Sequence, residues 1–128
     1  MAFNEDIARL ATESASFRRV VATGQHAQVV VMSVPAGGEI GEEVHEEVDQ
    51  VLVFVAGEGE AIVAGDRSAV LPGRLVFVPA GTRHNFVNTG SGDLKLYTVY
   101  GPPEHAAGTV HETKADADAA EHEGSSVT

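Results

Sequence analysis

Histidine and acidic side chains recur at two places in this sequence, with a spacing that suits a metal ion. Glu43 and His45 stand two positions apart within residues 37–57, and His84 lies within residues 73–88. Residues two apart on a β-strand point to the same face, so Glu43 and His45 can converge. His84 follows a Pro-x-Gly turn, which can start a strand that faces the first one. Two imidazoles and one carboxylate leave open positions for a substrate and suit one divalent transition metal, which is Fe(II), Mn(II), Ni(II), Co(II) or Zn(II).

Other residues offer a further metal ligand or a proton. Gln50 provides an amide oxygen as a fourth ligand beside Glu43, His45 and His84. Tyr97 and Tyr100 stand three apart on a predicted strand, so they face opposite sides and at most one enters an interior. A buried tyrosine hydroxyl can orient a ligand or donate a proton. The catalytic candidates are therefore Glu43, Tyr97 and Tyr100.

The second segment resembles the second sequence motif of the cupin family. All five fixed positions of that motif match at the family's spacing, and they are Gly73, Pro79, Gly81, His84 and Asn88. We interpret the glycines and the proline as turn residues, since glycine permits tight turns and proline ends a strand. Asn88 is expected to bond the backbone.

The first segment keeps the intervals of the first cupin motif from Gly37 to Gly57. Its three ligand positions, which the family fills with histidine, histidine and glutamate, hold Glu43, His45 and Gln50. The motif also permits a shorter interval before its glutamate, which makes Asp49 the fallback carboxylate ligand. Gln50 fits better, because Gly57 then falls at the required distance.

The resemblance implies an all-β fold, the double-stranded β-helix or jelly-roll barrel, with a metal site inside the barrel toward one mouth. The usual cupin ligands are three histidines and one glutamate. The set predicted here carries the same charge with one imidazole fewer, which shifts the preference toward Fe(II) or Mn(II).

Short strands separated by Gly-, Pro- and Asp-rich turns are predicted to position these residues, as in a sandwich or barrel. A short helix over residues 4–13, capped by Asn4, precedes them. The predicted strands are 17–22, 27–34, 43–45, 50–56, 59–64, 67–71, 74–78, 84–88 and 94–100.

The run Val51–Val55 is apolar at every position, which indicates that both faces of its strand are covered. The outer cover is either the N-terminal segment or a second copy of the chain, and we expect a homodimer.

Length and charge exclude several classes of protein. The chain has 128 residues, no cysteine and a net charge of −11. This predicts one domain without disulfides or thiolate metal sites, and it excludes nucleic acid and anionic membrane as partners. The N-terminus carries acid where a secretion signal carries base, so a cytoplasmic protein is expected. Residues 1–111 form the predicted cupin domain. Residues 112–128 form a predicted flexible acidic tail, with a short Ala-rich helix as the alternative.

Acidic residues crowd the first segment between residues 39 and 49. Most must be solvated, because close carboxylates repel one another. Their field is expected to attract divalent cations and to disfavour anionic substrates. The four other histidines are interpreted as surface or core residues, unless the extension after Tyr100 folds over the barrel mouth. They are His26, His105, His111 and His122.

Three functions fit this pattern, and the ligand in each is a small molecule. The first is a metal-dependent isomerase or lyase that acts on a small polar oxygenated molecule, as in sugar-isomerase-like cupins. A phosphorylated sugar is disfavoured, because only Arg83 and Lys95 supply positive charge near the second segment. The second is an Fe(II)-dependent dioxygenase. The third is a binding module without turnover. The departure of Glu43 and Gln50 from the residues of the first cupin motif favours this function.

Overall fold

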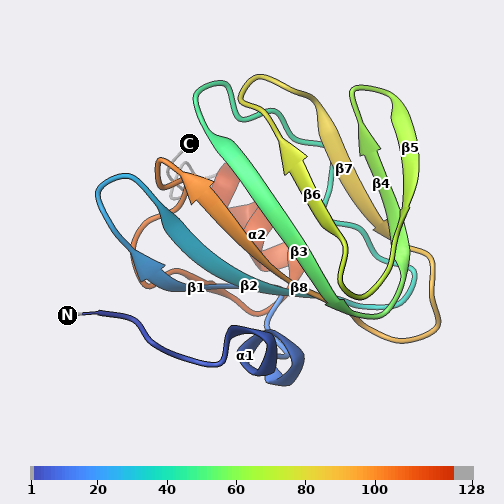
Figure 1. Ribbon diagram of the computed structural model, residues 1–128, viewed down its shortest axis with the longest axis horizontal. Coiled ribbons are helices and arrows are strands. Elements are labelled where there is room, and N and C mark those ends of the chain that lie inside the picture. Colours follow the sequence, from blue (N-terminus) through green and yellow to red (C-terminus); the bar gives the residue numbers. More distant parts are fainter. Residues whose placement is uncertain (1, 123–128) are drawn as a thin grey trace.

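The computed structural model describes residues 2–122, which form nine β-strands and two short helices (Figure 1). In chain order the elements are α1 (Ile7–Glu13), β1 (Arg18–Thr23), β2 (Gln28–Val34), β3 (Asp49–Ala56), β4 (Gly59–Val63), β5 (Asp66–Val70), β6 (Leu75–Val78), β7 (His84–Asn88), β8 (Leu94–Gly101), β9 (Val110–His111) and α2 (Lys114–His122). A six-stranded sheet has the order β6-β3-β8-β2-β1-β9, and a three-stranded sheet has the order β5-β4-β7. All strand pairs within these sheets are antiparallel.

The predicted strands correspond closely to the observed ones. Eight of them agree within one residue at each end. The predicted strand 43–45 is the exception, because it forms only an isolated bridge between Glu43 and His84. Strand β9 has no predicted counterpart, and it pairs with β1 at the edge of the larger sheet.

The core lies between the two sheets. Leu52 and Phe54 of β3 point inward and are 0% exposed, as is Phe86 of β7. The rings of Phe54 and Phe86 lie 5.6 Å apart, so the core joins the two sheets directly. Strand β8 alternates buried and half-buried residues along its whole length, as expected for a strand with one face in this core.

Helix α1 covers part of the outer face of the larger sheet, where it contacts β8, β2 and β3. The predicted cap at Asn4 is wrong, because the helix begins at Ile7 and Asp6 caps it by accepting a hydrogen bond from the Arg9 backbone N–H at 3.1 Å. The N-terminal segment, which was one of the two predicted covers of the Val51–Val55 run, therefore covers part of the outer face at this strand. On the neighbouring strand β6, Leu75 and Phe77 remain 60% and 53% exposed.

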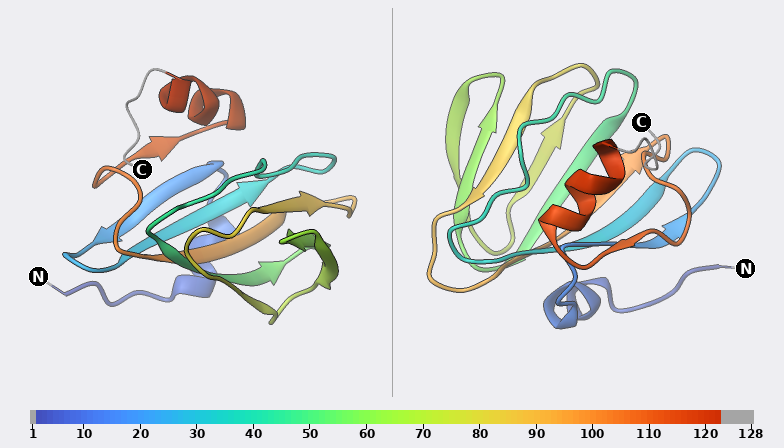
Figure 2. Two further views of the ribbon diagram at one scale, coloured as in Figure 1. Left: turned by 90° about the horizontal axis from the view of Figure 1, so that it is seen from above. Right: turned by 180° about the vertical axis from the view of Figure 1, so that it is seen from behind.

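Helix α2 lies on the opposite side of the larger sheet from α1 (Figure 2). It corresponds to the Ala-rich helix that was the alternative to a flexible tail. Thr113 caps it by accepting a hydrogen bond from the Asp116 backbone N–H, and Ala117 joins the hydrophobic core. The rest of the predicted tail, 123–128, lies outside the described residues.

Candidate metal centre

A two-residue bridge between distant parts of the chain builds the base of the site. Glu43 and His84 exchange backbone hydrogen bonds of 2.9 Å in both directions. His84 is the first residue of β7, directly after the turn at Pro79 and Gly81. The bridge therefore holds the first ligand of segment one against the ligand of segment two, and His45 follows two residues later.

The structure brings Glu43, His45 and His84 together as the sequence predicts. One ligand atom from each side chain lies within 4.8 Å of the other two. The Glu43 Oε1 atom is 3.6 Å from the His45 Nε2 atom, and the two imidazole rings have centroids 5.3 Å apart. The three donor atoms are close enough to share one metal ion with modest adjustment of the side chains.

Hydrogen bonds to the Nδ1 atoms leave both Nε2 atoms available. The His84 Nδ1 atom lies 2.9 Å from the Thr82 carbonyl oxygen, to which it donates. The His45 Nδ1 atom lies 3.3 Å from the Glu104 Oε2 atom. Both Nε2 atoms are buried and have no hydrogen-bond partner among the described residues. Two orphaned imidazole nitrogens beside a carboxylate fit a divalent transition metal.

Gln50 also points inward, whereas Asp49 does not join the cluster. The Gln50 side chain is buried, and its Nε2 atom donates to the Thr98 hydroxyl at 3.0 Å. Its Oε1 atom is left without a partner in the described part of the chain, as a metal ligand or a ligand-binding group requires. Asp49 is exposed, and its carboxylate accepts a hydrogen bond from the Ala80 backbone N–H at 2.9 Å.

Sequence reasoning missed Glu104, which is a second carboxylate at His45. Its side chain is 3% exposed, and it follows Pro102 and Pro103 directly after β8. Gln28 of β2 fixes this loop, because its Oε1 atom accepts hydrogen bonds from the backbone N–H groups of residues 104 and 105. A signal existed, since Glu104 is the one acidic residue between Tyr100 and His111.

The two tyrosines of β8 face opposite sides, as predicted, and Tyr100 is the inner one. It is 1% exposed, and its ring contacts the His45 ring edge-on with centroids 5.8 Å apart. Burial raises the pKa of Tyr100 well above its usual range, although the nearby Arg18 guanidinium opposes this. The hydroxyl therefore stays protonated. Tyr97 is half-buried on the outer face.

Burial and neighbouring charges shift the pKa values of the three side chains of the triad. Burial lowers the pKa of His45, but the two neighbouring carboxylates, first Glu104 and then Glu43, outweigh this and raise the pKa to about 9. Burial likewise raises the pKa of Glu43, but His45, with smaller contributions from Arg18 and His84, more than compensates, so the net pKa lies below its usual value. Burial lowers the pKa of His84. Without metal, His45 is therefore the protonated member of the triad.

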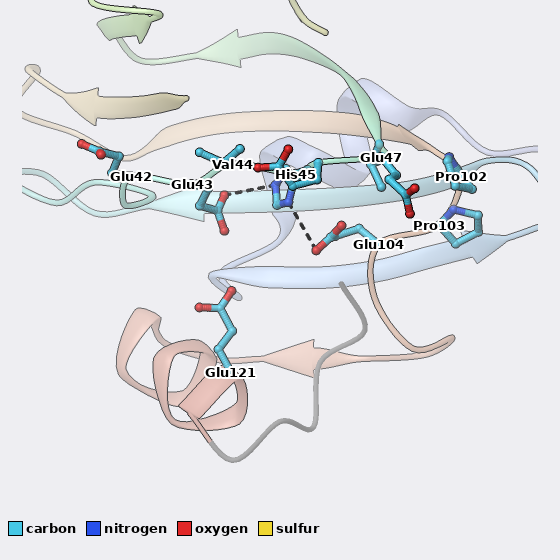
Figure 3. Close-up of a pocket in the computed structure, with 11 residues that line it drawn as sticks. Glu42, Glu43, Val44, His45, Glu47, Pro102, Pro103, Glu104 and Glu121 are labelled. Carbon is cyan, nitrogen blue, oxygen red and sulfur yellow. Dashed lines mark ion pairs between the residues drawn. The ribbon is translucent and has the colours of Figure 1, made fainter. Parts of the chain in front are cut away.

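A cavity of about 530 Å³ opens beside the triad (Figure 3). Figure 3 shows His45 between the carboxylates of Glu43 and Glu104, with Glu121 pointing toward them from helix α2. Exposed Glu46 and Glu47 of the acidic run also line the cavity. The entrance is thus acidic, in line with the expected attraction of divalent cations.

Comparison with known proteins agrees with this geometry. A family model described as the cupin domain matches residues 30–100. The chain belongs to the cupin family. This cupin is 45% identical over 125 residues to the uncharacterized protein YrkC of Bacillus subtilis, a match that covers 93% of this chain and 67% of YrkC.

Solved structures confirm the double-stranded β-helix fold. The cupin superposes on the crystal structure of BH2720 from Bacillus halodurans with a TM-score of 0.92 and 40% identity, covering 93% of this chain and 95% of that one. KdgF from Halomonas sp. gives a TM-score of 0.64 at 24% identity, covering 67% of this chain and 77% of that one, and shows the fold alone. Neither α1 nor α2 is long and apolar enough to cross a membrane.

Proposed function

We propose that this cupin is a metal-dependent enzyme of the isomerase or lyase type that acts on a small polar oxygenated molecule. The observation that carries the proposal is the convergence of three donors beside a cavity. The Nε2 atoms of His45 and His84 and the carboxylate of Glu43 face one point, and both nitrogens lack a hydrogen-bond partner among residues 2–122. Such a set leaves coordination positions open for a substrate.

The surrounding side chains support proton transfer rather than simple binding. A divalent metal held by Glu43, His45 and His84 would supply Lewis-acid stabilisation of negative charge on a substrate oxygen. The Tyr100 hydroxyl stays protonated and can donate a hydrogen bond to that oxygen. Glu104 lines the same cavity, and its Oε1 atom is buried with no partner in the described chain. We propose that this oxygen accepts a proton from a ligand carbon.

Metal content tests the first half of the proposal. We expect the purified protein to retain about one metal ion per chain after dialysis. His45→Ala and His84→Ala should each lose at least ten-fold in affinity, because each removes one of few ligands. The matched control is His26→Ala, because His26 is exposed and lies outside both segments. Unchanged metal content in both ligand variants would refute the site.

The identity of the anionic ligand has its own test. Glu43→Gln removes the carboxylate from the cluster and should weaken metal binding severely, whereas Asp49→Asn should be nearly silent. Gln50→Glu introduces the glutamate that the cupin motif has at this position and should tighten metal binding. If Asp49→Asn weakens metal binding and Glu43→Gln does not, Asp49 is the anionic ligand in place of Glu43.

Turnover separates the reaction types. The metal-loaded protein is incubated in D₂O with a panel of small hydroxy-carbonyl compounds, and exchange of carbon-bound hydrogen is followed by NMR. Exchange without oxygen consumption supports the isomerase or lyase. Oxygen uptake that needs both Fe(II) and substrate would identify the dioxygenase instead. A protein that binds compounds without exchange or oxygen uptake would be a binding module.

A further inference from the structure

Arg18 is a buried cation that the metal centre does not use. It lies on β1, whose side chains alternate, so Arg18 is 2% exposed while the neighbouring Arg19 is exposed. Arg18 is among the largest fully buried side chains of the structure. Burying a guanidinium is costly unless its charge is paired.

Within the described residues, Arg18 has no carboxylate at ion-pair distance. Its recorded contacts are with neutral groups: the Nη1 atom is 3.3 Å from the His111 Nδ1 atom, and the guanidinium carbon lies 5.4 Å from the centre of the Phe17 ring. The Tyr100 hydroxyl lies near enough for the guanidinium to act on it by a hydrogen bond. The Nε atom is buried with no partner in the described chain. A guanidinium has five N–H donors, so most of its capacity is unused.

A second set of unused polar atoms lies beside Arg18. Both ring nitrogens of His105 are buried without a partner among the described residues, and its side chain is almost fully buried. Burial and the charge of Arg18 lower the pKa of His105 to about 3, so the ring is neutral and offers one N–H. The Tyr100 ring contacts both His105 and His45, with centroids 5.4 and 5.8 Å away. Tyr100 thus connects these groups to the metal centre.

A cavity large enough for a small molecule connects Arg18 with the triad. Arg18 and Glu43 line one cavity of about 260 Å³, which shares Glu42, Glu43 and Glu121 with the larger cavity beside the triad. A molecule of a few carbon atoms can therefore contact Arg18 at one end and face the triad at the other.

The interior charges indicate the charge of that molecule. Arg18, Glu43 and Glu104 are the charged side chains around the site that are buried or nearly so. Counted with the protonated ring of His45, these charges sum to zero in the metal-free site. A divalent metal, which requires a neutral His45, would bring the sum to one net positive charge. A monoanion makes the site neutral. Four other acidic side chains line the Arg18 cavity, and they are Glu39, Glu42, Asp118 and Glu121. They do not oppose an anion strongly, because all four are exposed and screened by solvent, and Glu42 and Asp118 are paired with Arg83 and Lys114.

We propose that Arg18 binds the carboxylate of a small monoanionic hydroxy or oxo acid, whose second oxygen faces the triad. A carboxylate matches the planar fork of a guanidinium with two parallel hydrogen bonds. A phosphate dianion would bring a second negative charge that the interior does not balance. The proposal names the substrate class for the proposed function and rests on it for the metal end and for the charge balance, while the pairing of the buried Arg18 with a carboxylate stands independently.

The test compares lactate with lactamide, its neutral analogue of nearly the same shape, and with inorganic phosphate. Binding is measured by calorimetry on the metal-free and metal-loaded protein. We expect lactate, but not lactamide, to bind the wild-type protein. Arg18→Met should weaken lactate at least about ten-fold, because the partner charge is lost. Arg19→Met is the matched control, and it should leave lactate binding unchanged.

Stability gives a readout that a purely structural arginine would not produce. Without ligand, Arg18→Met should melt no lower than the wild type, because an apolar side chain of similar length replaces an unpaired buried charge. Arg18→Lys keeps the charge without the fork and should also weaken lactate, which preserves the test if Arg18→Met does not fold.

The outcomes separate this inference from the metal proposal. Lactate binding that is absent, or equal in wild type and the Arg18 variants, overturns the carboxylate site even if metal binds normally. Stronger binding of phosphate than of lactate, dependent on Arg18, overturns the carboxylate class. Lactate binding that depends on Arg18, in a protein that takes up no metal, supports the carboxylate site. It refutes only the proposal that Glu43, His45 and His84 hold a metal ion.

Discussion

Raising the pH of the metal-free protein should destabilise it in a window set by one residue. His45 lies 3.3 Å from Glu104 and 3.6 Å from Glu43, and these two carboxylates overcome the effect of burial and raise its pKa to about 9. In the unfolded chain histidine has its ordinary pKa of about 6.5. The stabilisation from the protonated ring is therefore fully present below about pH 6.5 and is lost as the pH rises through about 9.

The expected size follows from the shift. Each pKa unit corresponds to about 1.4 kcal/mol, so the free energy of unfolding should fall by roughly 3 kcal/mol across the window. For a domain of this length that corresponds to about 10 °C in melting temperature. Other described histidines with shifted pKa values do not interfere, because those pKa values are lowered and act below pH 6.5. They are His84, His105 and His111.

Thermal melts in the presence of a chelator provide the assay, at half-unit steps from about pH 6 to pH 9.5. His45→Gln should flatten the pH dependence, because the titrating ring is gone, and His26→Gln should leave it intact. With saturating metal the wild-type slope should also flatten or reverse, since the metal requires a neutral His45. A wild-type melting temperature that is constant through the window would refute the reasoning. So would an equal fall in His45→Gln.

Three further changes test other parts of the structure. Glu104→Gln should lower metal affinity about 10- to 100-fold in a chelator competition, because it weakens the hold on the ligating histidine, while exposed Glu47→Gln should not. Equal affinity in both variants would contradict this. Gln28→Leu leaves the backbone N–H groups of residues 104 and 105 without their acceptor and should cost roughly 2–3 kcal/mol in urea unfolding; a loss below about 0.5 kcal/mol would show that the loop needs no such support. Val53→Asp should convert the expected homodimer to a monomer in sedimentation, and a wild type that is monomeric at all concentrations would end the dimer prediction.

The metal triad could be predicted because its geometry is nearly local. Glu43 and His45 are two residues apart, and His84 follows a turn whose glycine and proline are visible in the sequence. The strand pattern was equally accessible, since Val-rich runs alternate with turn residues over most of the chain. The inner position of Tyr100 could be reduced to one of two choices, but only the register of β8 against β3 and β2 decides it.

The groups around the triad could not be predicted, because they depend on how loops return to the barrel. Glu104 and His105 are held in the interior by hydrogen bonds that their backbone N–H groups donate to Gln28. Arg18 faces inward although arginine usually lies at the surface. The cap of α1 was assigned to Asn4 when Asp6 provides it, because either residue type suits that position.

The pairing of β1 with β9 has a consequence for how such proteins can diverge. The match to the cupin domain spans residues 30–100 and contains Glu43, His45 and His84. Arg18 lies before that span and His105 after it, in the two stretches that β1 and β9 join side by side. The metal ligands proposed here thus lie inside the family match, and the residue proposed to bind the carboxylate lies outside it. If both proposals hold, a change confined to the ends of the chain would alter which molecule binds and leave Glu43, His45 and His84 intact, so we expect relatives with the same three residues to differ in ligand.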